Sequence, residues 1–316
     1  MTKLNLYRGS GDIPTFDHYG LISLENGWAS GACQYGQDLH VIGHVGEALF
    51  EWEISDPKSA SVASTMLNTR GTFDVVTAGM SSESNGKIYL SLNNSKDAFD
   101  LGPLQFFSRE ADKPGSLWVT EPAPHETPGV PILAFGAPTL IPYRTSLVCV
   151  YFNGNDGTLR YAVFDIPSGK WVWAEAVDSY PIDDPSDRRS PKIDTHVTAG
   201  VSAGILDDRI VLTFADHYTQ AGGPAAWIQG YSNPDSGKIY WTPWAPIPSA
   251  PATIGTVPQL VTYRGRLYAH WNYSKYSEFD GIHWSRPFQF NIDELEAGLP
   301  QVWRGSFMTI KNSDTL

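Results

Sequence analysis

A short run rich in β-forming residues recurs along this chain, and its repetition limits the fold more than any other feature of the sequence. Each run follows a turn and an earlier run of the same character. Strand-built repeats at intervals of roughly 45–60 residues are typical of sheets arranged radially about an axis, as in a β-propeller. The clearest copies are Asp38–His44, Lys87–Asn93, Ser146–Asn153, Arg209–Asp216 and Arg264–Asn272.

The two ends of the chain decide how many blades we expect. Five repeats are continuous in the sequence and begin near residues 27, 72, 136, 196 and 255. Lys3–Gly9 resembles the second strand of a repeat but has no first strand before it. Gly305–Ile310 resembles the first strand of a repeat but has no second strand after it. Pairing of these N- and C-terminal strands would close the ring and remove two open sheet edges. We therefore expect an all-β fold, a single β-propeller domain of six blades over residues 1–316. Five blades are the alternative, because the residues after Gly9 make a poor pair of outer strands.

The composition agrees with an all-β chain and excludes one class of partner. Aromatic residues make up 13% of the sequence, and it contains 29 Gly and 23 Pro. This combination favours strands joined by many turns. The net charge is −12. Because binding to a phosphate backbone needs basic patches, we expect no nucleic-acid partner.

The sequence also carries an expectation about location. No stretch approaches the roughly 18 apolar residues of a membrane span, and the N-terminus lacks an apolar targeting region. We expect a protein that is cytoplasmic or released without a classical signal peptide. Cys33 and Cys149 lie in apolar runs, so both are expected to be buried free thiols.

One candidate site lies at the ends of the second strands of the repeats. Aligning these strands places Tyr151, Phe214 and Trp271 in one column and polar residues two places further on. Sugars suit such a surface, because their C–H faces stack on aromatic rings and their hydroxyl groups need polar partners. The alternative is that the aromatic residues belong to the core and the polar residues cap turns. The predicted ligand-binding residues are Tyr151, Asn153, Asp216, His217, Trp271, Asn272 and Tyr273.

A second constellation would lie near the axis of the ring. Acidic residues and histidines precede several predicted inner strands, and such groups are the material of general acid–base catalysis. The alternative axial site consists of Asp17, His18, Asp74, Asp194 and His196. The sequence contains no phosphate-binding Gly-rich loop, no zinc-type pairing of His and Cys and no calcium-loop series of Asp. We therefore expect no metal and no cofactor.

The repeat pattern resembles that of propeller lectins from fungi and bacteria. Tyr263–Tyr268 and Phe279–Pro287 carry the resemblance best. It implies reversible binding of glycans or glycoconjugates at several shallow sites, without metal or catalysis. The repeats of this chain differ more from one another than those of that family.

Three functions follow from these observations. The first is a lectin-like propeller that binds glycans at the strand ends. This interpretation favours a protein that is not an enzyme. The second is an enzyme that acts on a sugar or small metabolite at one axial pocket with titratable groups. The third is a protein–protein interaction scaffold, which would expose an apolar patch on one face.

Overall fold

The computed structural model describes the chain as strands and turns. The described residues are 2–10, 15–23, 28–45, 48–56, 63–66, 75–82, 85–95, 101–113, 115–127, 129–186, 191, 201–215, 224–233, 236–251, 257–271, 275–289, 299–303 and 306–314. Among these residues, no helix is long and apolar enough to cross a membrane.

Strands from both ends of the chain share one sheet, and all the sheets are antiparallel. The shared sheet has the order β2 (Thr15–Ser23), β1 (Thr2–Ser10), β25 (Ser306–Asp314) and β24 (Leu299–Trp303). The next sheet contains β3 (Trp28–Tyr35), β4 (Asp38–Val45), β5 (Ala48–Ile54) and β6 (Ala63–Met66).

The middle of the chain forms one large sheet. Its order is β14 (Lys170–Ala176), β13 (Leu159–Asp165), β12 (Ser146–Asn153), β11 (Leu133–Tyr143), β9 (Leu101–Glu110), β8 (Lys87–Ser95) and β7 (Val75–Ser82), and β10 (Val119–Glu121) pairs with β9.

Two further sheets complete the described structure. One contains β15 (Val201–Leu206), β16 (Arg209–Phe214), β17 (Pro224–Ser232) and β18 (Ile239–Trp241), and β19 (Ala245–Pro251) also pairs with β17. The other contains β20 (Gln259–Tyr263), β21 (Arg266–Trp271), β22 (Lys275–Phe279) and β23 (Phe288–Gln289).

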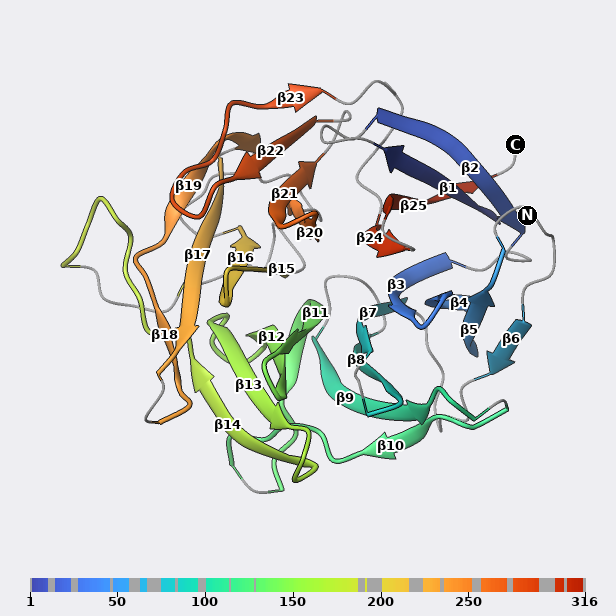
Figure 1. Cartoon of the computed structure of the whole chain (residues 1–316). Helices are drawn as coiled ribbons and strands as arrows, with labels where there is room; N and C mark the ends of the chain where they lie inside the picture. The colour runs from blue at the N-terminus through green and yellow to red at the C-terminus, as the bar shows by residue number, and fades with distance from the viewer. Residues whose placement is uncertain are drawn as a thin grey trace.

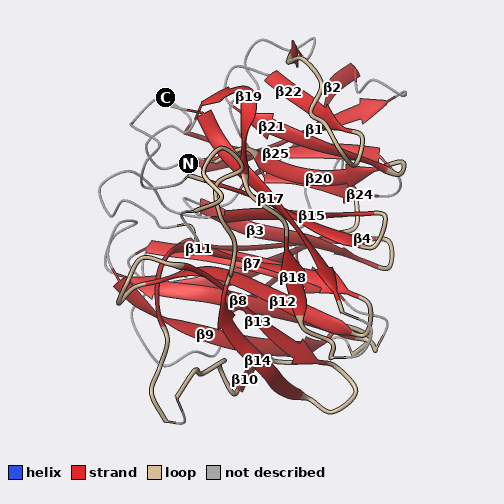
Figure 2. Cartoon of the chain, turned by 90° about the vertical axis from the view of Figure 1, so that its left-hand side faces the viewer, coloured by secondary structure: helices blue, strands red, loops and turns tan. Residues whose placement is uncertain are grey.

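The sheets are arranged around a common centre (Figure 1). The strands nearest the centre are β3, β7, β11, β15, β20 and β24, and each contacts its neighbour in that series, with β24 also contacting β3. The side view shows that strands of neighbouring sheets lie one above another across the molecule (Figure 2). The fold is therefore radial, as the repeat predicted.

The strand β12 shows why the second strands read as continuous apolar runs. Val148, Val150 and Phe152 pack into the core shared with β16. Cys149 and Tyr151, on the opposite face of β12, pack into the core shared with β8 and β9. A strand covered on both faces loses the alternation of apolar and polar residues that marks a half-exposed strand.

Both cysteines are free and buried, as expected. Burial raises the pKa of the Cys33 thiol well above its usual range, and it raises that of Cys149 to about 12. Both side chains therefore behave as small apolar groups of the core.

The terminal strands pair with each other, but in roles that differ from those expected. β1 runs antiparallel to β25, with Leu6 opposite Ile310. These two strands are the middle pair of their sheet, and the strand nearest the centre is β24. Pro300 lies in β24. Proline cannot donate a backbone hydrogen bond to a neighbouring strand, so the sequence did not predict a strand in this segment.

A buried network of polar groups joins the sheet of β4 and β5 to β9. Glu51 on β5 is 2% exposed, and its Oε1 lies 2.6 Å from Nη2 of Arg109 and 2.8 Å from Nδ1 of His40. Its Oε2 accepts a 2.8 Å hydrogen bond from Nε1 of Trp118. Both carboxylate oxygens are satisfied, so this buried charge is compensated across two neighbouring sheets.

Gly230 on β17 is required by an aromatic contact between two sheets. A Cβ at this position would lie 2.6 Å from Cζ3 of Trp241 and 2.8 Å from Cγ2 of Ile239. The Trp241 ring in turn packs edge-on against Tyr161 of β13, with 5.5 Å between ring centroids.

The substitution Gly230→Ala is therefore expected to lower the free energy of unfolding by about 1–3 kcal/mol, because the added methyl group overpacks this contact. Urea denaturation followed by tryptophan fluorescence measures the change. An unchanged midpoint would show that the Trp241 ring moves aside without cost.

Candidate functional site

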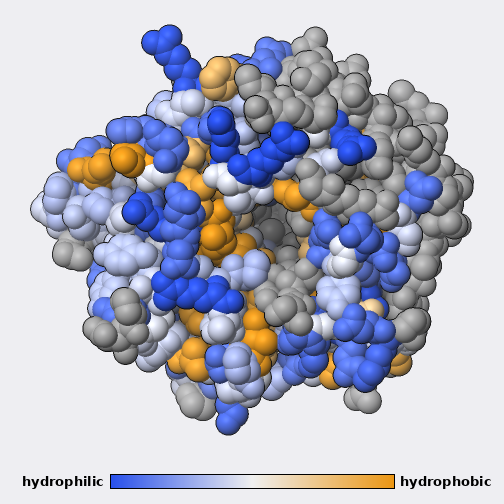
Figure 3. All heavy atoms as spheres, viewed as in Figure 1, coloured by the Kyte–Doolittle hydropathy of each residue, from blue (hydrophilic) through white to orange (hydrophobic). Residues whose placement is uncertain are grey.

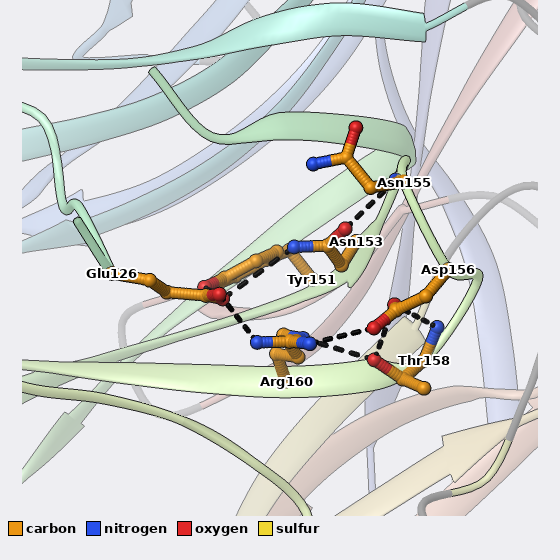
Figure 4. A network of polar contacts seen from close by, with 7 residues as sticks. All are labelled: Glu126, Tyr151, Asn153, Asn155, Asp156, Thr158 and Arg160. Atoms are coloured by element: carbon orange, nitrogen blue, oxygen red, sulfur yellow. Dashed lines mark hydrogen bonds and ion pairs between the residues drawn. The ribbon is translucent and has the colours of Figure 1, made fainter. Parts of the chain in front are cut away.

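Polar side chains gather where β12 ends and β13 begins, and the close-up in Figure 4 shows them pointing toward one another. Tyr151 and Asn153 end β12, and Arg160 lies on β13. Glu126 reaches this place from the segment that leads into β11. We call the following set the Arg160 cluster: Glu126, Tyr151, Asn153, Asn155, Asp156, Thr158 and Arg160.

The turn between β12 and β13 is held by its own side chains. Oδ1 of Asn153 accepts the backbone N–H of Asn155 at 2.8 Å. Oδ1 of Asp156 accepts both the N–H of Thr158 at 3.0 Å and its hydroxyl at 2.6 Å. Asn and Asp stabilise turns by such bonds to residues two places on. The turn therefore presents the Asp156 carboxylate in a set position.

Arg160 bridges the two carboxylates of the cluster. Its Nη1 lies 2.5 Å from Oε2 of Glu126, and its Nη2 lies 2.7 Å from Oδ2 of Asp156. Its Nε donates to Oγ1 of Thr158 at 2.9 Å. A guanidinium group presents its donors in a planar fork, so both acids are held at a set distance and orientation.

Glu126 accepts hydrogen bonds through both oxygens and still reaches solvent. Oε1 accepts the Tyr151 hydroxyl at 3.2 Å and Nδ2 of Asn153 at 3.5 Å. The side chain of Glu126 is 27% exposed, and that of Asp156 is 41% exposed. Two oriented carboxylates are thus available to a ligand at this edge.

The electrostatics keep Asp156 charged and Tyr151 neutral. Burial would raise the pKa of Asp156, but hydrogen bonds from Thr158 and Arg160 outweigh it and hold that pKa below its usual value. Burial, with the nearby Glu126, raises the pKa of Tyr151 far above its usual range. Tyr151 therefore serves as a hydrogen-bond donor to Glu126 at neutral pH.

The segment after β14 returns to the same edge. The carbonyl of Pro191 accepts the backbone N–H of Leu159 at 2.8 Å. Further back, Tyr180 and Ile182 form backbone hydrogen bonds with Trp244. Residues 180–182 therefore bind the neighbouring sheet, and Pro191 lies beside the Arg160 cluster.

One face of the molecule has a hollow at its centre (Figure 3). Hydrophobic residues lie on one side of the hollow, and hydrophilic residues cover much of the surrounding face.

The structure brings together two of the predicted ligand-binding residues, Tyr151 and Asn153, which both contact Glu126. Trp271 lies in a separate core beside β15 and β16 and is 4% exposed. The remaining predicted residues lie outside the described part of the chain, namely Asp216, His217, Asn272 and Tyr273.

For the alternative axial site, the structure describes only the backbone of two residues. Asp17 and His18 lie on β2, opposite Arg8 and Tyr7 of β1. Three more of its residues lie outside the described residues, namely Asp74, Asp194 and His196.

Sequence reasoning missed Glu126, Asp156 and Arg160. Glu126 is far from Arg160 in sequence. It lies before β11 in a segment with three prolines, Pro122, Pro124 and Pro128. One signal could have found it. In an antiparallel repeat, the segment entering a first strand and the turn leaving a second strand meet at the same sheet edge.

Comparison with known proteins gives matches in structure only. No protein-family model matches this sequence, and no curated protein matches it. Among solved structures, the α-L-arabinanase of Penicillium chrysogenum, in complex with arabinobiose, has a TM-score of 0.58 and 11% identity, covering 99% of this chain and 98% of that one. The GH93 α-L-arabinofuranosidase of Fusarium graminearum, also with arabinobiose, has a TM-score of 0.55 and 10% identity, covering 97% and 98%.

At such low identity the likeness concerns the fold. The chain is a β-propeller. The likeness extends over nearly the full length of this propeller, so it does not depend on one shared sheet.

The lectin-like function expected from the sequence needs correction. Two propellers that match nearly the whole chain, an arabinanase and an arabinofuranosidase, are glycan-processing enzymes and not lectins. The loose strand pattern of Tyr263–Tyr268 and Phe279–Pro287 reflects blade packing, which lectin and enzyme propellers share. In this chain Tyr263, Leu267, Phe279 and Trp284 are all buried.

Proposed function

We propose that this protein is an enzyme that cleaves glycosidic bonds in arabinose-containing glycans. The observation that carries the proposal is the nearly full-length likeness of its propeller to an α-L-arabinanase and an α-L-arabinofuranosidase, both solved with arabinobiose. The Arg160 cluster supports it, because Glu126 supplies one of the two carboxyl groups that glycoside cleavage generally requires.

Glu126 is the described residue best suited to a chemical role. It is partly open to solvent, and its orientation is set by Tyr151, Asn153 and Arg160. We assign it the part of the carboxylate that stabilises positive charge developing on the sugar. Asp156, held by Thr158 and Arg160, accepts hydrogen bonds from sugar hydroxyl groups.

The general acid in this proposal comes from the axial set. That set comprises Asp17, His18, Asp74, Asp194 and His196. Asp194 is the first choice for the general acid. It follows Pro191 by three residues in the sequence, and the carbonyl of Pro191 accepts the N–H of Leu159 beside the cluster.

We further propose that the propeller has six blades and that its ring is closed by the terminal strands. The antiparallel pairing of β1 with β25 supports closure. The six innermost strands, each in contact with the next, support the blade count. Closure of this kind leaves no unpaired edge between the first and last blades.

The proposal is tested with purified protein and a panel of substrates. We expect release of arabinose or short arabino-oligosaccharides from arabinobiose and linear arabinan, measured by chromatography of the products. Xylotriose serves as a control substrate of different sugar identity. A folded protein that leaves arabinobiose, arabinan and aryl arabinofuranosides intact from acidic to neutral pH would contradict it.

A further inference from the structure

A pocket lies on the opposite edge of the propeller from the Arg160 cluster. It has a volume of about 220 Å³ and is formed between the turn that joins β15 to β16 and the turn that follows β22. The Arg160 cluster instead uses the turn from β12 to β13 and the segment entering β11. Because successive strands are antiparallel, these two kinds of turn lie at opposite edges of the sheets.

The pocket wall is partly preorganised. Nη1 of Arg209 donates to Oε1 of Gln229 at 3.2 Å, and Nε2 of Gln229 donates to the carbonyl of Gly281 at 3.2 Å. These bonds fix the guanidinium and link the two turns across neighbouring sheets. A ligand would therefore meet groups that are already in place.

Two carboxylates on the wall keep hydrogen-bonding capacity. Oδ1 of Asp280 accepts the backbone N–H groups of Ile282 and His283, while its Oδ2 has no hydrogen bond among the described residues. The Asp207 carboxylate has no ion pair or hydrogen bond within the part of the chain that the structure describes. Asp207 has a φ of 48°, a left-handed conformation imposed by the tight turn.

Two exposed tyrosines continue the wall outward. Tyr231 follows Gln229 by two residues on β17, so both side chains leave the same face of the sheet. The register that pairs Ile210 with Gly230 places Arg209 opposite Tyr231, and Tyr231 pairs with Tyr240 of β18. The two tyrosine rings are tilted by 30° with centroids 6.0 Å apart, and each residue is about half exposed.

The mixture of groups selects the chemistry of the ligand. Asp207 and Asp280 repel an anion, and Arg209 repels a cation. A polyhydroxylated ring needs both donors and acceptors, and its C–H face stacks on aromatic rings. The volume is below the roughly 300–1,000 Å³ of pockets for drug-sized ligands, which suits a single sugar unit.

We propose that this pocket and the tyrosine pair form a second, non-catalytic subsite that holds one or two sugar units of a glycan chain. The arabinose identity of those units rests on the proposed function. The subsite anchors a polymeric substrate at the edge remote from the Arg160 cluster. Short substrates bypass it, because they occupy only the catalytic edge.

The test compares Tyr240→Ala and Asp207→Asn with Phe288→Ala, which also removes a half-exposed aromatic side chain from an outer strand. Asparagine tolerates the left-handed backbone at position 207. Affinity electrophoresis in gels containing soluble arabinan measures binding. We expect Tyr240→Ala and Asp207→Asn each to bind arabinan about tenfold more weakly than wild type, while Phe288→Ala binds normally.

Activity assays separate this proposal from the proposed function. Hydrolysis of arabinan should weaken in Tyr240→Ala and Asp207→Asn, while hydrolysis of arabinobiose stays at the wild-type rate. If wild-type protein cleaves nothing but arabinan binding still depends on Tyr240 and Asp207, the subsite stands and the enzymatic proposal fails. If both variants bind and cleave arabinan as Phe288→Ala does, or if wild type does not bind arabinan, the subsite is refuted.

Discussion

Replacing Glu51 with glutamine is expected to lower the free energy of unfolding by about 3–5 kcal/mol. The carboxylate is buried between two sheets and neutralises Arg109. Glutamine fills nearly the same volume, so the loss comes from an uncompensated buried guanidinium and not from a cavity. Urea denaturation of the two proteins at neutral pH gives the difference.

The matched control is Glu278→Gln. Glu278 pairs with Arg266 across β21 and β22, where the side chains are 30% and 53% exposed. Solvent screens this pair, so the expected loss is below about 1 kcal/mol. Equal losses at positions 51 and 278 would contradict the inter-sheet role of Glu51.

The effect of Glu51 should also depend on pH. Burial would raise the pKa of Glu51, but the hydrogen bond from His40 and the charge of Arg109 outweigh it, so the folded-state pKa lies below the ordinary 4.5. The stabilisation is therefore present above the unfolded-state value and is lost as the pH falls through the folded-state value. The difference between wild type and Glu51→Gln should shrink only at pH values below 4.5.

Replacing Glu126 with glutamine is expected to reduce turnover of arabinobiose by about 10²–10³-fold, the usual contribution of one group that stabilises transition-state charge. Glutamine keeps the shape but cannot stabilise positive charge on the sugar. The ion pair with Arg160 is partly exposed, so the free energy of unfolding should change by less than about 1 kcal/mol. Initial rates and urea denaturation give the two quantities.

Asp208→Asn is the control for Glu126. Asp208 pairs with Arg144 at an exposed turn between two sheets, away from the Arg160 cluster. Its loss should leave turnover unchanged. If Glu126→Gln turns over arabinobiose at the wild-type rate, Glu126 takes no part in the chemical step.

The sequence predicted the architecture well where packing repeats and poorly where it does not. β12 and β16 were readable because burial on both faces demands an apolar run such as Leu147–Phe152. β24 was missed because it is short and contains Pro300.

The candidate site was only half predictable. Tyr151 and Asn153 stand out at a strand end, and the structure places them in the Arg160 cluster. Their partner Glu126 comes from an irregular Pro-rich segment, and no local pattern records which distant residue a loop will meet. The aromatic columns were ambiguous for another reason: a ring that closes a core and a ring that stacks on a ligand have the same sequence signature.

The pairing of β1 with β25 has a consequence for how this protein is made. β1 is synthesised before every other described strand, and its partner β25 is synthesised after them all. Until then β1 exposes a row of backbone groups that can pair with another nascent chain. This sheet must also join the two described strands that are most distant in sequence, and such non-local pairing is slow. Aggregation during synthesis should therefore respond to the translation rate of the last strand more than to that of any interior blade.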